Sequence, residues 1–370
     1  MADGILAGLR VVELSAFVAA PLGGATLAAM GAEVVRVDPL GGGIDIGRWP
    51  LHEGRSLYWQ GLNRGKRSVT LDLRSERGRE VAARLAADAG TVLTNLPARG
   101  PLAFEALRAR RPDLVLVSIG GRTDGGAAVD YTVNAGMGFP WVTGPEGHDR
   151  PVNHVLPAWD VATGYLAVAA LLAADRHRLL TGEGRLVRLS LAEVAMVVAD
   201  HLGLLAEARL VEEPRGRFGN HLFGSFARDF RTRDGRFVIV LALTARQWRG
   251  LAEATGLPFE RLDADLADEG ERWRRRREIC DLLEPWIAGR TLAQVAEAFE
   301  RHQVLWGPYL TFKEVLAEQG SAWRPPASAL DFGEGQRQPA VPGPALGQDT
   351  AAVLSALGED VEALRTEGVI

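Results

Sequence analysis

Short apolar runs alternate with longer stretches of helical periodicity through the first half of the chain. Runs of this length are typical of strands buried in a parallel sheet, and helical stretches between them form crossover connections. The predicted strands cover residues 9–13, 33–38, 68–72, 91–94, 114–118 and 186–190. The predicted helices cover about 21–30, 76–87, 102–110, 161–175 and 191–208. This alternation predicts an open α/β sheet with right-handed crossovers.

The pattern changes after a charged linker that contains Pro and Gly at 212–217. Two strand-like runs at 226–232 and 236–241 flank a strong hairpin turn signal, and helices follow at about 245–255, 270–288 and 292–302. The remaining chain is rich in loops and proline, with one helix near 350–357. Because this tail has too little apolar pattern to fold alone, it is expected to return to the first domain. The expected divisions are 1–212 for a large α/β domain, 213–305 for a small α+β domain, and 306–370 for the return.

The most apolar helical pattern, Val161–Ala174, carries no charge and is directly preceded by Asp160. A carboxylate in this place can cap the helix by accepting hydrogen bonds from its free N–H groups. It can also be a nucleophile against a bound substrate. The position alone favours the cap. With 14 residues, the run is too short to cross a bilayer and predicts a buried core helix.

The composition narrows the function classes. The chain has 370 residues, 47% hydrophobic and 24% charged, as is ordinary for a soluble protein with two domains. A net charge of -5 gives no basic field for nucleic acid. One cysteine, Cys280, excludes an intrachain disulfide, and the N-terminus lacks a signal-peptide pattern. We therefore expect a cytoplasmic protein without a nucleic-acid or membrane partner.

Two ligand sites can be considered from the residues themselves. Asp38 ends the second predicted strand, where a dinucleotide-binding acid would lie, but the preceding turn lacks the required Gly-x-Gly-x-x-Gly pattern. Arg64, Lys66 and Arg67 precede the third strand, and Arg74 follows it. These cations form either a solvated turn or a phosphate-binding edge, and their spacing does not decide between the two. The seven histidines include no His-x-x-x-His pair, so no metal site is expected.

Several segments in a fixed order resemble one family, the family III CoA-transferases, which also contain α-methylacyl-CoA racemases and carnitine CoA-transferase-like proteins. These segments are Leu9–Ser15, Ala20–Pro21, Met30–Asp38, Asn63–Leu73, Asp160–Gly164, Thr181–Leu191, Trp306–Pro308 and Pro344–Gly347. The resemblance implies a Rossmann-like large domain built from both chain ends and a small α+β domain between them. It also implies a homodimer whose two subunits are interlocked like links.

The resemblance further implies an activity. Asp160 matches the family's catalytic aspartate, which attacks an acyl-CoA thioester and forms covalent aspartyl intermediates while CoA moves to a carboxylic acid. Coenzyme A is then a substrate, and no metal is needed. The matched positions for contacts along CoA are Arg74, Phe17, Leu71 and Leu191. Looser candidates for its phosphates are Arg64, Lys66 and Arg67, and Arg99 is expected to replace a cation that contacts CoA a few residues later in relatives.

The chain also departs from the family pattern. Val129 stands where the racemases carry a histidine that moves a proton, which counts against racemisation. The segment 241–245 lacks the glycine-rich turn of many transferases. Two alternatives to CoA transfer therefore stay open: a racemase or isomerase of acyl-CoA on the same scaffold, and a CoA-binding protein without catalysis. The acceptor pocket is expected in the loops 119–158 and 217–245, with a dicarboxylate acceptor if His154, Arg217 or His221 face it.

Overall fold

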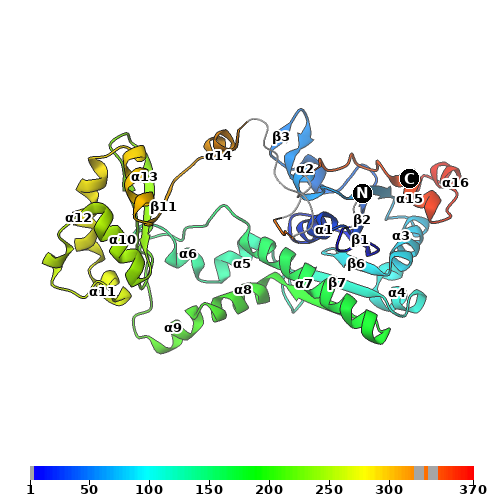
Figure 1. Cartoon of the computed structure of the whole chain (residues 1–370). Coiled ribbons are helices and arrows are strands. Elements are labelled where there is room, and N and C mark those ends of the chain that lie inside the picture. The colour runs from blue at the N-terminus through cyan, green and yellow to red at the C-terminus, as the bar shows by residue number, and fades with distance from the viewer. Residues whose placement is uncertain (1–3, 321–328, 332–340) are drawn as a thin grey trace. The chain divides into compact units, whose positions relative to one another are not determined.

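The computed structural model describes residues 4–320, 329–331 and 341–370, which form two compact units (Figure 1). The first unit contains the described residues before 138, those of 154–212, and those after 323. The second contains 138–153 and the described residues from 213 to 320. Each unit has its own hydrophobic core.

The first unit is built on a parallel six-stranded sheet in the order β5-β2-β1-β6-β7-β8. Its strands are β1 (Arg10–Leu14), β2 (Glu33–Pro39), β5 (Arg67–Leu71), β6 (Thr91–Thr94), β7 (Val115–Gly120) and β8 (Leu186–Ser190). The α/β class and the parallel sheet are as predicted from the alternation of apolar runs. The direction of winding reverses between β1 and β6, and open α/β sheets bind ligands beyond the carboxyl ends of the strands at such a point.

Successive side chains of a strand point to opposite faces of the sheet, and helices pack on both faces. Val12 and Leu14 of β1 join a core with the helices α3 (Glu76–Ala89), α4 (Phe104–Arg110), α15 (Thr350–Ala356) and α16 (Val361–Thr366). The next strand position, Glu13, is covered by α1 (Ala19–Ala29), since a Cβ added at Gly24 would lie 1.7 Å from its Oε2. Helix α1 packs closely along α7 (Ala158–Thr181).

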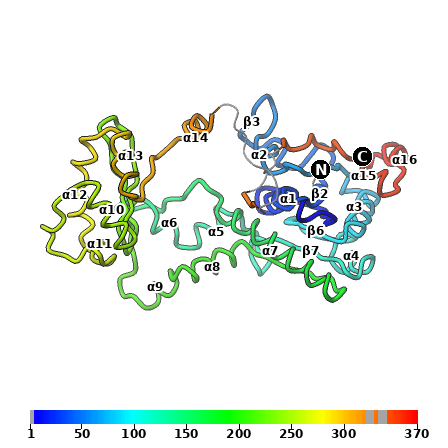
Figure 2. Tube along the Cα trace, in the orientation of Figure 1, coloured from blue at the N-terminus to red at the C-terminus, as the bar shows by residue number. Residues whose placement is uncertain are grey.

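The C-terminal segment runs along the outer edge of β5, beside the N-terminal half of the same unit (Figure 2). The N–H of Ser68 donates to Oδ2 of Asp349 at 2.9 Å, and the N–H of Asp349 donates to the carbonyl of Ser68 at 2.8 Å. Further along, the N–H of Asp72 donates to the carbonyl of Val369 at 2.8 Å. The sheet unit is thus made from both halves of the sequence.

The second unit contains an antiparallel sheet in the order β11-β10-β9. Its strands are β9 (Phe226–Arg231), β10 (Phe237–Ala242) and β11 (Leu305–Pro308), and its main helices are α10 (Ala245–Thr255), α12 (Arg276–Ala288) and α13 (Leu292–Arg301). Arg217 attaches residues 138–153 to this unit, because its buried guanidinium donates to the carbonyls of Trp141 at 2.8 Å and His148 at 3.0 Å.

The shorter elements complete the chain. They are η1 (Ile44–Gly47), β3 (Leu51–His52), β4 (Arg55–Ser56), α2 (Leu57–Leu62), η2 (Gly100–Leu102), α5 (Asp130–Gly136), α6 (Phe139–Val142), α8 (Leu191–His201), α9 (Leu204–Leu210), η3 (Phe259–Leu262), α11 (Glu269–Arg274) and α14 (Phe312–Gln319).

The structure differs from the sequence-based expectation in four places. The expected boundary at 305 falls inside β11, whose pairing with β10 keeps it in the second unit. The segment 119–158, expected to be a loop, contains α5 and α6, and its residues 138–153 belong to the second unit. The predicted helix 191–208 is divided at Gly203, whose φ of 75° ends regular helix.

The fourth difference concerns α7, which has 24 residues instead of the expected fifteen or so. Within the described part of the chain, it is the one helix long and apolar enough to cross a membrane by length and composition. Buried core helices satisfy the same criterion, and α7 packs on α1, β7 and α8. The helix is therefore weak evidence for a membrane span.

Candidate active site

Asp160 lies in the first turn of α7 but does not cap this helix. The N-cap residue is Pro157, which offers no side-chain acceptor. The cap is supplied from α5, where Oδ2 of Asp130 accepts hydrogen bonds from the N–H groups of Trp159 at 2.7 Å and Asp160 at 3.0 Å. The interpretation of Asp160 as a helix cap is therefore wrong, and its carboxylate is available for another role.

The carboxylate of Asp160 faces the beginning of α1. The backbone N–H of Ala19, the first residue of that helix, lowers the pKa of Asp160. The N-cap of α1, Val18, has no polar side chain, so the positive end of the helix dipole is open toward the carboxylate. Such an arrangement stabilises negative charge on Asp160.

Two glycines allow this close approach of α1 and α7. A Cβ added at Gly164 would lie 2.7 Å from the carbonyl oxygen of Ala19, and one added at Gly23 would lie 3.2 Å from the carbonyl oxygen of Gly164. Side chains at either position would push the helices apart. The glycines thus fix the separation of Asp160 from the N-terminus of α1.

The surroundings make Asp160 more basic than an ordinary aspartate. Burial and, next, the negative charge of Asp130 raise the pKa of Asp160 to about 6, against the opposing effects of Arg48 and the Ala19 N–H. The guanidinium of Arg48 lies between two rings, 5.2 Å from the centroid of Phe17 and 4.7 Å from that of Tyr58. At neutral pH, Asp160 is ionised and has a fixed cation in its electrostatic environment.

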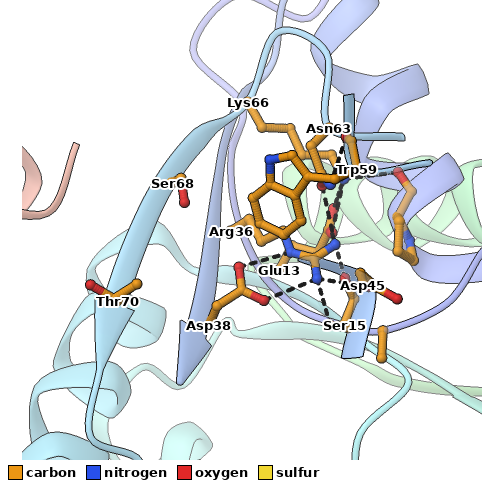
Figure 3. A network of polar contacts seen from close by, with 12 residues as sticks. Glu13, Ser15, Arg36, Asp38, Asp45, Trp59, Asn63, Lys66, Ser68 and Thr70 are labelled. Atoms are coloured by element: carbon orange, nitrogen blue, oxygen red, sulfur yellow. Dashed lines mark hydrogen bonds and ion pairs between the residues drawn. The ribbon is translucent and has the colours of Figure 1, made fainter. Parts of the chain in front are cut away.

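A buried polar network supports the loop before α1 (Figure 3). Arg36 lies at its centre, where Nε donates to Asp38 and Nη2 donates to Asp45, each at 2.9 Å. The guanidinium stacks against the ring of Trp59, 4.6 Å from its centroid. Asp45 also accepts the N–H of Phe17 at 2.9 Å. Phe17 has a φ of 64°, which is uncommon for a bulky side chain, so this hydrogen bond holds an unfavourable backbone conformation at the edge of the site.

Lys66 belongs to this network and is not open to solvent. Its Nζ lies 2.8 Å from Glu13 and donates to the carbonyl of Pro21 at 2.9 Å and to Asn63 at 3.0 Å. Burial lowers the pKa of Lys66 to about 8, in spite of the charge of Glu13. With a side-chain exposure of 0%, Lys66 does not have the freedom to bind a phosphate of CoA.

The rest of the basic segment is also dispersed. Arg64 precedes β5 and Arg67 is its first residue, whereas Arg74 follows the strand, so that they lie toward opposite ends of it. Arg67 pairs with Glu33 at 2.8 Å. Arg74 is 92% exposed beside Asp72. The structure therefore does not bring the cations of this segment together, and among Arg64, Lys66, Arg67 and Arg74 it is Arg74 that lies at the carboxyl edge of the sheet.

A cavity of about 170 Å³ lies at this edge, beside the paired ends of β1 and β6. Its lining is Leu14, Leu73, Arg79, Val92, Thr94, Leu96, Pro97, Ala98, Arg99, Leu102 and Leu116. Arg99 was predicted as a CoA contact, but Arg79 was not, because nothing in its helical pattern distinguishes it from other surface arginines. Asn95 bridges the two strand ends through the N–H and carbonyl of Ala16, at 2.9 and 2.6 Å.

The other predicted contacts differ in accessibility. Phe17 is 39% exposed, whereas Leu71 and Leu191 are buried in the protein. The side chains of these two leucines are therefore not accessible to a ligand in this structure. Val129 directly precedes Asp130 at the start of α5, and its apolar side chain leaves the racemase's proton-transfer position empty of acid or base.

The residues considered for an acceptor site have other roles or stay unassigned. The donors of Arg217 are used on backbone carbonyls within the second unit. In the same unit, buried Arg272 donates to the carbonyls of Ala242 at 3.1 Å and Leu243 at 2.8 Å, which fixes the segment that lacks the family's glycines. In the ranges that the structure covers, no group of three or more His, Cys, Asp or Glu side chains is arranged to hold a metal ion.

Comparisons with known proteins identify relatives of this chain. A family model described as CoA-transferase family III matches residues 6–356. The chain is 46% identical to a 2-methylfumaryl-CoA isomerase of Chloroflexus aurantiacus, over 99% of this chain and 98% of that protein. It is 30% identical to a succinate–glutarate CoA-transferase of Agrobacterium fabrum, over 98% of this chain and 97% of that protein.

A solved structure, that of a CAIB/BAIF family protein from Brucella suis, superposes with a TM-score of 0.81 at 26% identity. The superposition covers 96% of this chain and 100% of the Brucella suis chain. The family match over nearly the whole sequence, the similarity to enzymes that act on CoA thioesters, and the shared fold lead to one conclusion. The chain is an enzyme that belongs to CoA-transferase family III.

Proposed function

We propose that this enzyme isomerises the CoA thioester of a short unsaturated dicarboxylic acid by moving CoA from one carboxyl group to the other through Asp160. The observation that carries the proposal is the carboxylate of Asp160, which does not cap α7 and lies against the open N-terminus of α1. The positive charge of Arg48 favours its ionised form. The 46% identical 2-methylfumaryl-CoA isomerase supports the substrate class. Isomerisation is then CoA transfer within one molecule.

The chemistry follows from the two unequal carboxyl groups of methylfumarate. An oxygen of Asp160 attacks the thioester carbonyl, the C–S bond breaks, and CoA leaves as the thiolate. The thiolate then attacks the aspartyl carbonyl of the resulting anhydride, which releases the dicarboxylate and leaves CoA on Asp160. The other carboxylate attacks this enzyme thioester and displaces CoA as the thiolate, which forms a second anhydride with Asp160. The thiolate then attacks the substrate carbonyl of this anhydride, which releases the carboxylate of Asp160 and gives the isomeric thioester. Each step exchanges an acyl group between oxygen and sulfur, so no water is consumed.

The surroundings of Asp160 suit these steps. A carboxylate with a pKa of about 6 is ionised at neutral pH and more nucleophilic than an ordinary aspartate. The N–H groups at the start of α1 provide donors for the oxygens that gain charge during attack. Arg48, fixed between Phe17 and Tyr58, is the proposed partner for the free carboxylate of the substrate.

Coenzyme A is proposed to bind at the carboxyl edge of the sheet. Its nucleotide would use the cavity beside the ends of β1 and β6, whose lining includes Arg79 and Arg99. Arg74, exposed after the end of β5, is a further candidate contact. Phe17 would meet the ligand through its exposed ring. The proposed steps require no metal ion.

A homodimer and a cytoplasmic location complete the proposal. Large apolar side chains are exposed along α7 and α8, and their burial against a second subunit would remove this surface from water. They are Tyr165, Leu166, Leu179, Leu180, Met196 and Val197. Interlocking of the two subunits is part of the same proposal. Size-exclusion chromatography with light scattering measures the number of subunits.

Intermolecular transfer is the second candidate, because the relatives include a succinate–glutarate CoA-transferase and a succinyl-CoA–D-citramalate CoA-transferase. The two functions are separated by incubating the enzyme with 2-methylfumaryl-CoA and a tenfold excess of ¹³C-labelled free methylfumarate. We expect the positional isomer, 3-methylfumaryl-CoA, without label. Labelled thioester would show exchange with the free acid and favour intermolecular transfer. A cis–trans isomer as the product would contradict both mechanisms.

Asp160→Asn tests the nucleophile in the same assay, with Asp200→Asn on α8 as a matched control. We expect loss of turnover in the first variant and normal turnover in the second. Hydroxylamine added during turnover converts the activated Asp160 to a hydroxamate, which peptide mass spectrometry detects. Retained turnover in Asp160→Asn contradicts its role as nucleophile.

A further inference from the structure

Asp130 is a second carboxylate in the active site, and the proposed reaction does not use it. Its side chain is 2% exposed. Oδ2 receives two backbone N–H groups of α7, whereas Oδ1 is buried with no hydrogen-bond partner. A buried acceptor without a donor is costly and rare in folded proteins. The presence of a carboxylate with one unpaired oxygen at this position therefore needs an explanation.

Capping alone does not explain a charged residue at this position. The oxygen of an asparagine amide, or the hydroxyl of a serine, would accept the same N–H groups without a buried charge. What a carboxylate adds is a negative charge beside Asp160, which acts on that residue through space. Like charges in one site disfavour the ionised form of their neighbour.

We infer that Asp130 is a positioning residue for Asp160. Asp130 caps α7 from helix α5, so the carboxylate of Asp160 is not used as the cap. The buried charge of Asp130 also favours the acylated state of Asp160 over the ionised one. This inference rests on Asp160 being the nucleophile of the proposed function.

The charge balance of the first step explains the benefit. Before attack, the oxygens of Asp160 carry one negative charge; after attack they are part of a neutral anhydride, and the charge has moved to the sulfur of CoA. The repulsion between Asp130 and Asp160 is present only before the C–S bond breaks, so its relief lowers the barrier of that step. The enzyme–CoA thioester is equally neutral at Asp160 and gains in the same way.

Other charged groups near α7 do not provide this effect. Arg48 acts in the opposite direction, and α1 carries no charged side chain. β8 and α8, which pack against α7, carry Arg188, Glu193, Asp200 and His201. Of the charged side chains whose placement the structure gives, only Asp130 and Arg48 affect the charge of Asp160.

Asp130→Asn separates the charge from the cap. The amide oxygen keeps the acceptor for Trp159 and Asp160, so the fold should persist, which circular dichroism checks. Asp130→Ser is a second neutral acceptor in case the first variant does not fold. The control is Asp349→Asn, another carboxylate that accepts a backbone N–H in the same unit, at Ser68.

Two readouts test the inference. The first is the titration of Asp160 itself, by ¹³C NMR of aspartate-labelled protein with Asp160→Asn to assign the signal. We expect the midpoint to move down by roughly one pH unit in both Asp130 variants and to stay in the control. The second is the acid limb of kcat/KM, which should move with it, while kcat on the plateau falls by no more than about tenfold.

The outcomes are distinct. An unchanged titration midpoint in Asp130→Asn overturns the inference, even if turnover is lost, because a purely structural role would give that result. A shifted midpoint without any loss of kcat overturns the catalytic benefit. Since the NMR titration needs no substrate, it stands even if the isomerase proposal fails, and failure of the two can be told apart.

Discussion

Replacing Asp160 by asparagine should make the protein inactive and, at neutral pH, more stable. The pKa of Asp160 is about 6 in the folded protein, against an ordinary value of 3.8, so that folding takes place at the cost of an unfavourably placed charge. Below pH 3.8, the group is neutral in both states and contributes nothing. The cost grows as the pH rises from 3.8 to 6 and is complete above 6. Asparagine removes it.

The magnitude follows from the shift. Two pKa units correspond to an upper limit of about 3 kcal/mol, which solvent screening at this half-buried position reduces to roughly 1–2 kcal/mol. A gain of this size raises the midpoint of thermal unfolding by about 2–4 °C per kcal/mol for a unit of this length. At pH 4.5, about a third of the gain should remain, because most of the cost appears above that pH.

Urea unfolding of wild type and Asp160→Asn at pH 7.5 and pH 4.5 measures this effect, with turnover recorded on the same preparations. Asp200→Asn, an exposed change on α8, should stay within about 0.5 kcal/mol of wild type at both values. Equal or lower stability of Asp160→Asn at pH 7.5 would refute the electrostatic account of the site. So would a gain that is the same at both pH values.

Three further changes test other parts of the site. Gly164→Ala places a Cβ 2.7 Å from the carbonyl of Ala19, so we expect a loss of about 1–3 kcal/mol in urea unfolding and a lower kcat; Gly61→Ala, with open space around its Cβ, is the control, and equal behaviour of the two would contradict the helix contact. Lys66→Met leaves buried Glu13 without its closest cation and should cost about 3 kcal/mol or more at pH 7, measured by the same method; a stability near wild type would show that the network is dispensable. Arg74→Ala should raise KM for the CoA thioester several-fold with little change in kcat, whereas Arg67→Ala, paired with Glu33, should leave KM unaltered; the reverse order would place the nucleotide at the other end of β5.

The framework of the fold could be predicted because it follows from local pattern. The apolar run predicted at 9–13 is β1 at Arg10–Leu14, and the hairpin signal around Arg233–Gly235 lies between β9 and β10. The conformational preferences of Gly and Asp in turns act over a few residues and can be recognised in the sequence. The strand order could not be derived in the same way, since it depends on which strands meet after collapse.

The electrostatic structure of the site was less predictable, because it depends on residues distant in sequence. Asp130 caps a helix that begins 28 positions later, and no local motif links the two. Three cations within four positions left a solvated turn and a phosphate-binding edge open, and the pattern did not show that Lys66 turns inward to Glu13 while Arg67 pairs with Glu33. Likewise, the place of Asp160 before an apolar helix suggested a cap, but the cap of α7 comes from Asp130.

The pairing of Ser68 with Asp349 has a consequence during protein synthesis. The two residues are 281 positions apart, and a ribosome needs roughly 15 to 60 s to make that length of chain. For this time, the nascent polypeptide presents the outer rim of β5 with its peptide groups unshielded, a template for unwanted association with other chains. Holdase chaperones would be needed most in that interval, and a messenger truncated before codon 349 would yield a product whose rim is never closed.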